Sequence, residues 1–192
     1  MKAWYFSRED KKLRYGDNRI VKAGITHKVS CKPVLCESGL HGSNKIIDAL
    51  SYAPGPYIWR VELGGEMDIG DNKISATERK YLWGYDATDI LRKFARKCAL
   101  DVVHLWDAPD VVLEYLKTGD EKLRTAANSV GYSVGYSANS AANSAANSAA
   151  NSAANSAAYS AAYSAGYYVG YYAAWKKQNN RLTSMIVRGR QK

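Results

Sequence analysis

The first 124 residues alternate between short apolar runs and polar turns, a pattern typical of a small domain that combines strands and helices. Aromatic and β-branched residues, which favour strands, fill residues 2–8 and 57–63. We expect Gly64-Gly65 to end the second strand and residues 39–43 to form a loop. Shorter apolar runs predict strands at 20–28, 34–36 and 79–85, and a hairpin of 67–69 with 73–76 across the turn 70–72.

Three segments of the same region carry helical signals. Residues 86–100 repeat apolar side chains at helical spacing, namely Ile90, Leu91, Phe94 and Cys98. Ser43 or Asn44 is suited to cap a helix that runs through Tyr52, and Pro109 is suited to begin one that runs through Lys117. We therefore predict an α+β domain over residues 1–124.

A tetrapeptide repeat follows this domain. Tetrads of the form NSAA begin at Asn139, later change to YSAA and YYAA, and end at Trp175. No charged residue occurs from Thr125 to Trp175. Alanine is the best helix former, so a helix is favoured, and 51 helical residues would span about 75 Å. A silk-like stack of strands is the alternative, because Ala, Ser, Gly and Tyr also build such sheets.

A long uncharged segment needs packing partners, and we expect these to be copies of the same chain. Glycines at 131 and 170, and at 135 and 166, are symmetric about the junction of residues 150 and 151. This symmetry suits an antiparallel pairing, either between two chains or in a hairpin that turns near Asn151. The residues expected to mediate assembly are Asn139, Asn143, Asn147, Asn151, Asn155, Tyr159, Tyr163, Tyr167, Tyr171, Gly131, Gly135, Gly166 and Gly170.

Identical tetrads specify their register weakly, so a closed oligomer and an open filament both remain possible. Self-association as a structural protein is the function that the repeat predicts. Enzymatic activity is not the first expectation for the chain, because no catalytic constellation stands out from the residue types and their spacing.

The net charge of +9 comes mainly from a basic tail over residues 176–192, which contains six Lys and Arg residues and no acid. We expect such a tail either to contact nucleic acid weakly or to serve only to keep the chain soluble. Three cysteines, Cys31, Cys36 and Cys98, occur without a secretory leader, which predicts reduced thiols in the cytoplasm. The spacing of Cys and His predicts no metal site, and we expect no cofactor and no membrane span.

Several segments of residues 1–124 resemble an uncharacterised domain family of phages and bacteria, whose members often end in Ala-rich short repeats. The resemblance implies a phage or prophage origin, and hence the cytoplasm of a bacterial host. The segments that carry it are 36–43, 48–55, 60–66, 76–79, 86–88 and 98–109.

The order of motifs is also similar to that of ADP-ribosyltransferases. Gly39-Leu40-His41 is followed by Ser51-Tyr52-Ala53, a hydrophobic strand at 57–63, and Glu78 before another strand. The similarity implies that Glu78 polarises a ribose hydroxyl, that His41 stacks on nicotinamide, and that Tyr52 belongs to the same site. An enzyme of this class, or a nucleotide-binding module, is thus the alternative function. In a purely structural interpretation, His41 bonds to backbone and Glu78 pairs with Arg79 or Lys80.

Overall fold

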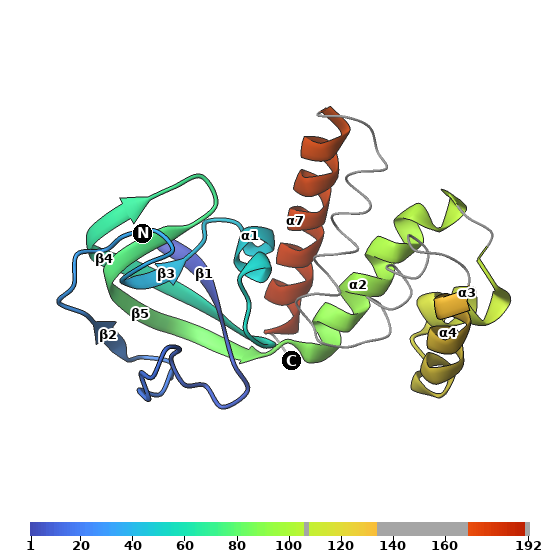
Figure 1. The fold of residues 1–192 in the computed structure, drawn as a ribbon, viewed down its shortest axis with the longest axis horizontal. Helices are drawn as coiled ribbons and strands as arrows, with labels where there is room; N and C mark the ends of the chain where they lie inside the picture. Colours follow the sequence, from blue (N-terminus) through green and yellow to red (C-terminus); the bar gives the residue numbers. More distant parts are fainter. Residues whose placement is uncertain (106–107, 134–168, 191–192) are drawn as a thin grey trace. The chain divides into compact units, whose positions relative to one another are not determined.

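The computed structural model describes residues 1–105, 108–133 and 169–190. The chain divides into two compact units, Met1–Ala87 and Thr88–Lys192, and each is described by itself. The first unit, hereafter the sheet unit, is built on an antiparallel sheet, and the second, the helical unit, contains helices in its described part (Figure 1). The predicted combination of a sheet and helices in the N-terminal part of the chain is confirmed.

The sheet of the first unit has the order β1-β4-β5-β2, and β3 pairs with another part of β5. All these pairings are antiparallel. Reciprocal bonds between Trp4 and Ser43, at 2.8 and 2.9 Å, join the end of β3 to β1 and curve the sheet round (Figure 1). The strands are β1 (Lys2–Ser7), β2 (Thr26–Lys28), β3 (Leu40–Gly42), β4 (Tyr57–Ile69) and β5 (Ile74–Asp86).

The longest pairing, β4 with β5, contains the predicted hairpin. Gly70 donates its N–H to the carbonyl of Lys73 at 2.9 Å, and Ile69 lies opposite Ile74. The prediction that β4 ends at Gly64-Gly65 is wrong. The strand continues to Ile69. An irregularity between Gly64 and Met67, with Gly65 at φ +69°, accommodates the two glycines, and β4 pairs with β5 on both sides of it.

Three other predictions for this unit need correction. Residues 40–42, expected within a loop, form β3, because they pair with β5 and because Gly42 lets Ala3 and Leu63 approach closely. Within the range 20–28, only β2 is a strand. Residues 34–36 belong to a turn closed by a bridge between Val34 and Ser38, with Cys36 at φ +64°. Tertiary pairing, rather than local propensity, decides each of these segments.

A core cluster of the sheet unit combines side chains of β1, β3, β4 and β5 with Leu13 and Val21. Aromatic rings contact one another edge to face there, as Trp59 and Tyr81 do at 5.7 Å between centroids. Helix α1 (Ile46–Ser51), which matches the helix predicted to run through Tyr52, packs against β1 and buries Ile46, Ile47 and Leu50. The core cluster consists of Ala3, Leu13, Val21, Leu40, Trp59, Val61, Leu63, Ile74, Ala76 and Tyr81.

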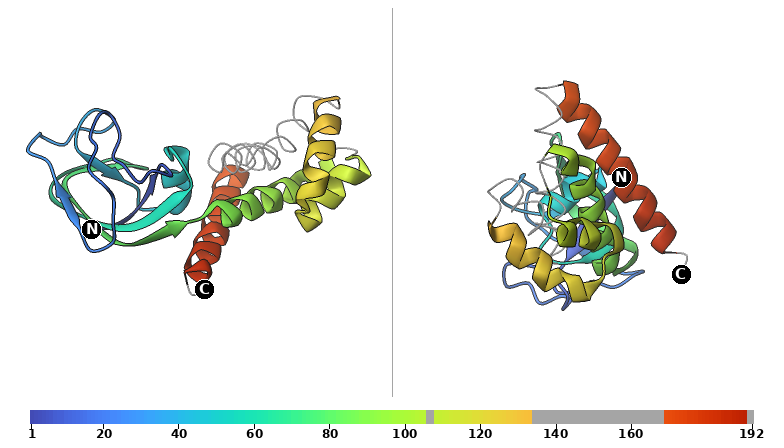
Figure 2. Two further views of the ribbon diagram at one scale, coloured as in Figure 1. Left: turned by 90° about the horizontal axis from the view of Figure 1, so that it is seen from below. Right: turned by 90° about the vertical axis from the view of Figure 1, so that its right-hand side faces the viewer.

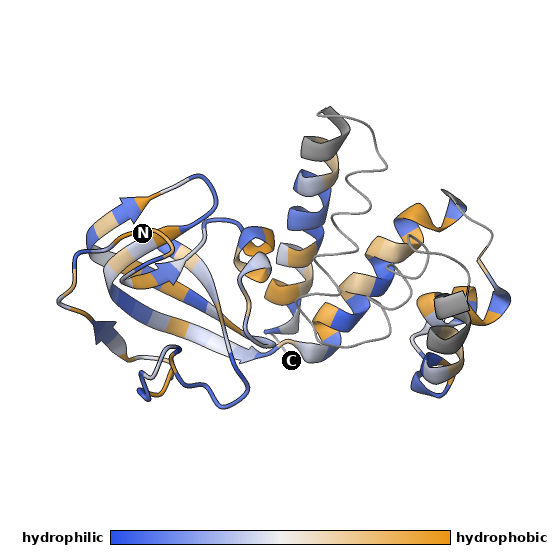
Figure 3. Cartoon of the chain, in the orientation of Figure 1, coloured by the Kyte–Doolittle hydropathy of each residue, from blue (hydrophilic) through white to orange (hydrophobic). Residues whose placement is uncertain are grey.

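The helical unit begins with α2, on which apolar and polar residues alternate (Figure 3). Leu91, Phe94 and Cys98 are buried as predicted, while Ile90 is partly exposed. Helices α3 and α4 lie side by side (Figure 2), and Gly119 in the left-handed conformation ends α3. The helices are α2 (Thr88–Val102), a 3₁₀ turn η1 (Val103–Leu105), α3 (Asp110–Thr118), α4 (Glu121–Ser133) and α7 (Val169–Gly189).

The repeat is described only at its two ends. Two tetrads, NSVG and YSVG, precede Asn139 and begin at Asn128, and α4 extends into them and includes Gly131. Helix α7 begins within the last tetrads and includes Gly170 and Tyr171. The predicted basic tail is largely part of α7. None of the described helices is both long and apolar enough to cross a membrane. The assembly residues outside the described ranges are Gly135, Asn139, Asn143, Asn147, Asn151, Asn155, Tyr159, Tyr163, Gly166 and Tyr167, so the helix prediction there stays a prediction.

Candidate functional site

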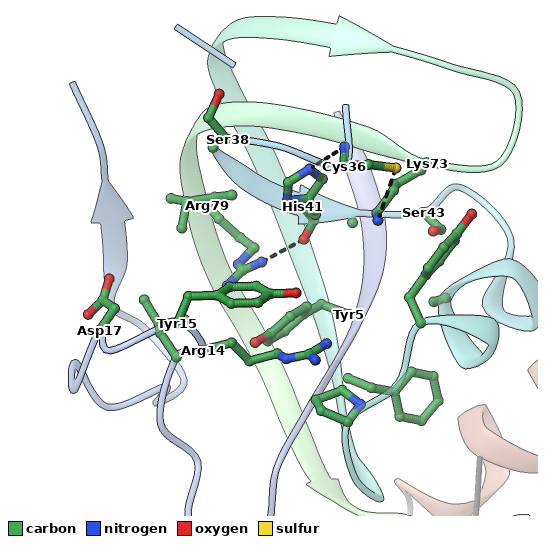
Figure 4. Close-up of a pocket in the computed structure, with 18 of the residues that line it drawn as sticks. Tyr5, Arg14, Tyr15, Asp17, Cys36, Ser38, His41, Ser43, Lys73 and Arg79 are labelled. Carbon is green, nitrogen blue, oxygen red and sulfur yellow. Dashed lines mark hydrogen bonds between the residues drawn. The ribbon is translucent and has the colours of Figure 1, made fainter. Parts of the chain in front are cut away.

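A pocket of about 420 Å³ opens in the sheet unit. Its walls come from β1, the loop of residues 13–17, the segment 36–43 that includes β3, and the end of α1 (Figure 4). Arg79 reaches it from the middle of β5, and Lys73 reaches it from the turn directly before β5. A cavity of this size lies within the range of sites for small molecules.

Arg79 is the most informative residue of this pocket, because its side chain is only 2% exposed. Its Nη1 donates to the carbonyl of His41 at 2.6 Å and its Nε to the hydroxyl of Tyr81 at 2.9 Å. The guanidinium also lies 3.7 Å from the ring centroid of Tyr5. Among the described residues, no carboxylate forms an ion pair with it. A buried positive charge without a counter-charge is costly, so the pocket favours an anion.

In the part of the chain that the structure describes, three basic and two acidic residues line the pocket. Arg14 and Lys73 line it together with Arg79, and the acidic residues that line it are Asp17 and Glu37. Asp17 is already neutralised, because Arg19 Nη2 lies 2.6 Å from its Oδ2. Hydrogen bonds from Arg19 hold the pKa of Asp17 below its ordinary value, so this carboxylate stays ionised and paired.

Two of the cations that line the pocket lie against aromatic rings. The Arg14 guanidinium lies 5.0 Å from the ring centroid of Tyr15, and Lys73 Nζ lies 4.0 Å from that of Tyr52. Tyr15 is 93% exposed and has φ +61°, an uncommon backbone conformation for a residue with a bulky side chain. Such rings offer flat surfaces on which a planar ligand can stack, while the adjacent cations favour negative charge.

His41 is held by the backbone. Its Nε2 accepts a hydrogen bond from the N–H of Cys36 at 3.2 Å (Figure 4). Burial lowers the pKa of His41, and the charges of Lys73 and Arg79 lower it further, so the ring is neutral at physiological pH. His41 is thus bonded to backbone, as in the structural interpretation, but it lies in strand β3 and not in a loop. The Cys36 thiol lies 3.6 Å from Lys73 Nζ.

The structure brings together two of the three residues suggested by the ADP-ribosyltransferase similarity. His41 and Tyr52 line the pocket, whereas Glu78 is not among its lining residues. Glu78 forms an ion pair at 2.7 Å with Lys28, which lies opposite it on β2, and not with Arg79 or Lys80. The arrangement therefore offers the pocket a buried arginine where the similarity implied a carboxylate.

Sequence reasoning missed Arg79, Arg14 and Lys73. For Arg79 a signal was present: it stands two residues before Tyr81 in a strand, and so shares with it the face that points to the core. A charged residue on such a face needs a partner or a function. For Arg14 and Lys73 the sequence carries no comparable signal, because both lie at the ends of turns.

The described residues contain no group of three or more His, Cys, Asp or Glu side chains that could hold a metal ion. Cys31 and Cys36 are exposed free thiols, and Cys98 is a buried one.

Comparison with known families adds one finding. Residues 10–93 match the family model described as a domain of unknown function, DUF7666. This match fits the predicted resemblance to an uncharacterised family, and it includes every residue that lines the pocket except Trp4, Tyr5 and Phe6 of β1. Searches of curated proteins and of solved structures find no match to the chain. The predicted phage origin and the similarity to ADP-ribosyltransferases stay predictions.

Proposed function

We propose that the sheet unit binds a small anionic ligand with a planar ring, and that nucleotides are the class that fits its pocket. The observation that carries this proposal is Arg79, a buried guanidinium on the pocket with no carboxylate partner among the described residues. A phosphate group would supply the missing negative charge. The planar guanidinium presents several N–H donors in a fixed geometry, which matches phosphate oxygens well.

The aromatic residues of the pocket support a ring-bearing ligand over a bare anion. Tyr5 lies against Arg79, and Tyr15 and Tyr52 stand beside Arg14 and Lys73. A base stacked on one of these rings would bring its phosphate within reach of a cation. Stacking of a nucleobase on an aromatic side chain is worth roughly 1–3 kcal/mol.

Binding, rather than transfer of ADP-ribose, is the activity that the arrangement supports. Glu78 pairs with Lys28 outside the pocket, and the Nε2 of His41 is occupied by a backbone N–H. These two residues therefore offer no acid–base pair to a ligand in the pocket.

Isothermal titration of the full chain with ADP, AMP, adenosine and inorganic phosphate tests the proposal. We expect ADP and AMP to bind at least tenfold more tightly than adenosine, and Arg79→Met to remove the difference. Lys80→Met is the matched control, because Lys80 is the next residue of β5 and is exposed. Failure of all four compounds to bind, or unchanged binding by Arg79→Met, would contradict the proposal.

A second proposed function is self-association through the repeat. Its support is the absence of charge from Thr125 to Trp175, together with the helical structure of α4 and α7, which enter the repeat from both sides. Light scattering of the full chain over a range of concentrations tests it directly. A mass that rises above that of one chain is expected, and a single-chain mass at every concentration would contradict it.

The predicted contact of the basic tail with nucleic acid receives less support. Two of the six basic residues of that segment, Lys177 and Arg181, lie within 4.0 Å of Asp101. These two charges are thus already used within the helical unit, and fewer remain for a polyanion.

A further inference from the structure

Helix α7 is attached to α2 by a polar cluster, here called the clasp, of Cys98, Asp101, Lys177, Gln178 and Arg181. Arg181 binds Asp101 with two hydrogen bonds, from Nη1 to Oδ2 at 2.8 Å and from Nη2 to Oδ1 at 3.1 Å. Lys177 Nζ and Gln178 Nε2 lie 3.3 and 3.2 Å from the same carboxylate. Burial alone would raise the pKa of Asp101, but hydrogen bonds and charge from Arg181 outweigh burial and lower it.

The inner part of the clasp consists of two buried side chains, Gln178 and Cys98, which form a hydrogen bond with each other. Gln178 is 1% exposed, and its Oε1 accepts a hydrogen bond from the thiol of Cys98 at 3.0 Å. Burial raises the pKa of Cys98 to about 12, so the thiol keeps the proton that it donates. Polar groups buried in this way are costly without their partners, so α7 requires an α2 to dock on.

Nothing in the clasp requires α2 and α7 to belong to the same chain. Among the described elements of the helical unit, α7 has its main contacts with α2. Residues 134–168 stand between α4 and α7, and this stretch of 35 residues would span about 52 Å even as a helix. The α2 surface of a second copy offers α7 the same carboxylate, thiol and packing. Exchange of identical elements in this way is a low-cost route to a dimer.

We propose that two copies of the chain exchange their α7 helices, each docking on the α2 of the other. This inference rests on the proposed self-association and specifies its mechanism. Each repeat in such a dimer runs from one helical unit to the other, and the two repeats run in opposite directions. The symmetry of the four glycines in the sequence fits this arrangement.

Charge reversal in separate chains tests the exchange. Asp101→Arg leaves three positive charges in the clasp of its own chain, at positions 101, 177 and 181, and Arg181→Asp places two negative charges there beside Lys177. In an exchanged dimer of the two variants, both clasps pair opposite charges again. We therefore mix the variants, unfold them in denaturant, refold them together, and measure mass and composition by native mass spectrometry.

We expect at least tenfold more mixed dimer than dimer of either variant alone. The control is the double variant in one chain, Asp101→Arg with Arg181→Asp, which restores opposite charges and should self-associate like the wild type. If the wild type self-associates but the variants form no excess of mixed dimer, the exchange is wrong and the proposed self-association stands. If the wild type has the mass of one chain at all concentrations, self-association itself fails, and the exchange with it.

Discussion

Arg79 is buried and hydrogen-bonded, but its positive charge is not balanced by a carboxylate among the described residues. Its donors hold the carbonyl of His41 and the hydroxyl of Tyr81, yet its charge has no counter-ion among the described residues. A purely structural arginine of this kind is hard to explain, because apolar side chains fill buried space at lower cost. A ligand anion would explain why the charge lies in this place.

The stability of Arg79→Met separates these two roles. Without ligand, we expect its free energy of unfolding to be within about 1 kcal/mol of the wild type or higher, because the buried charge is removed. ADP at about 100 times its Kd should stabilise the wild type by about 2.7 kcal/mol and leave the variant unchanged. Urea unfolding with and without ADP measures both. A loss of several kcal/mol in the absence of ligand would instead assign Arg79 a structural role.

Hydrogen bonds link Arg79 to Tyr81 and Tyr81 to His27, and we expect His27 to make the stability of the sheet unit depend on pH. The Tyr81 hydroxyl accepts a hydrogen bond from Arg79 Nε, and it lies at hydrogen-bond distance, 3.0 Å, from His27 Nδ1. Burial, with the charges of Arg19 and Arg79, lowers the pKa of His27 below its ordinary value of 6.5. The unfolded chain therefore binds more protons as pH falls below about 6.5, and stability decreases from there down to the lowered pKa.

His27→Gln tests this dependence, because the side-chain amide can still form a hydrogen bond with the Tyr81 hydroxyl, as donor or acceptor, but does not titrate. Urea unfolding at about pH 7 and about pH 5 should show a smaller loss of stability on acidification in the variant than in the wild type. Some loss should remain, since the pKa of His41 is lowered as well. The exposed His104 of η1 provides the control as His104→Gln. An equal loss in His27→Gln and the wild type would refute the assignment.

Among single residues, the similarity found in the sequence indicated His41 and Tyr52 as members of one site, and both line the pocket. Arg79 was missed because it stands between a glutamate and a lysine, as a solvated residue would, although its spacing of two from Tyr81 places both on one face of the strand. Its importance comes from the direction of its side chain, and this depends on the register of β5 with β2 and β4.

Among the elements, β4 and β5 position the site, because Arg79 lies on β5 and Lys73 lies in the turn that joins the two strands. Their aromatic and β-branched composition made these strands predictable. The continuation of β4 through Gly64-Gly65 was not predictable, since two glycines break a strand as often as they form a bulge within one. Strand β3 was missed because three residues carry too weak a local signal to distinguish pairing from a loop.

Gly84 provides a test of how closely β4 and β5 pack. It lies opposite Trp59, and a Cβ added there would contact the Trp59 ring and lie 2.6 Å from the carbonyl oxygen of Ile58. We expect Gly84→Ala to lower the free energy of unfolding by roughly 1–3 kcal/mol through overpacking.

The matched control is Gly64→Ala on β4, where the nearest atoms to an added Cβ belong to Glu78 and lie 3.9 Å away. Thermal unfolding of both variants makes the comparison, and Gly64→Ala should be close to the wild type. Equal effects of the two substitutions would show that the register of Trp59 against Gly84 is not as described.

For the whole molecule, we propose that the sheet unit binds the ligand and that the helical unit mediates assembly. The pocket residues belong to the sheet unit, while the clasp and both described ends of the repeat belong to the helical unit. The sequence showed the repeat and its lack of charge plainly, since both are matters of composition. It did not show the clasp, because Asp101 and Arg181 are 80 residues apart and nothing local connects them.

Replacement of residues 134–168 by a Gly/Ser linker of equal length separates the two activities. Such a linker keeps α4 and α7 joined but removes the Ala-rich tetrads. We expect the mass measured by light scattering to fall at least twofold at high concentration, while ADP binding is within about twofold of the wild type. Loss of ADP binding together with assembly would show that the two activities are not separable.

The most direct test of the account is the NMR signal of the Arg79 side chain. In ¹⁵N-labelled full-length protein, the Nε–H resonance assigned by its loss in Arg79→Met is followed during titration with ADP. Saturable movement of this resonance with ADP, and little movement with adenosine, is the predicted result. An Arg79 resonance that stays in place while ADP binds elsewhere, or while no resonance of the protein moves at all, would contradict the assignment of this pocket to an anionic ligand.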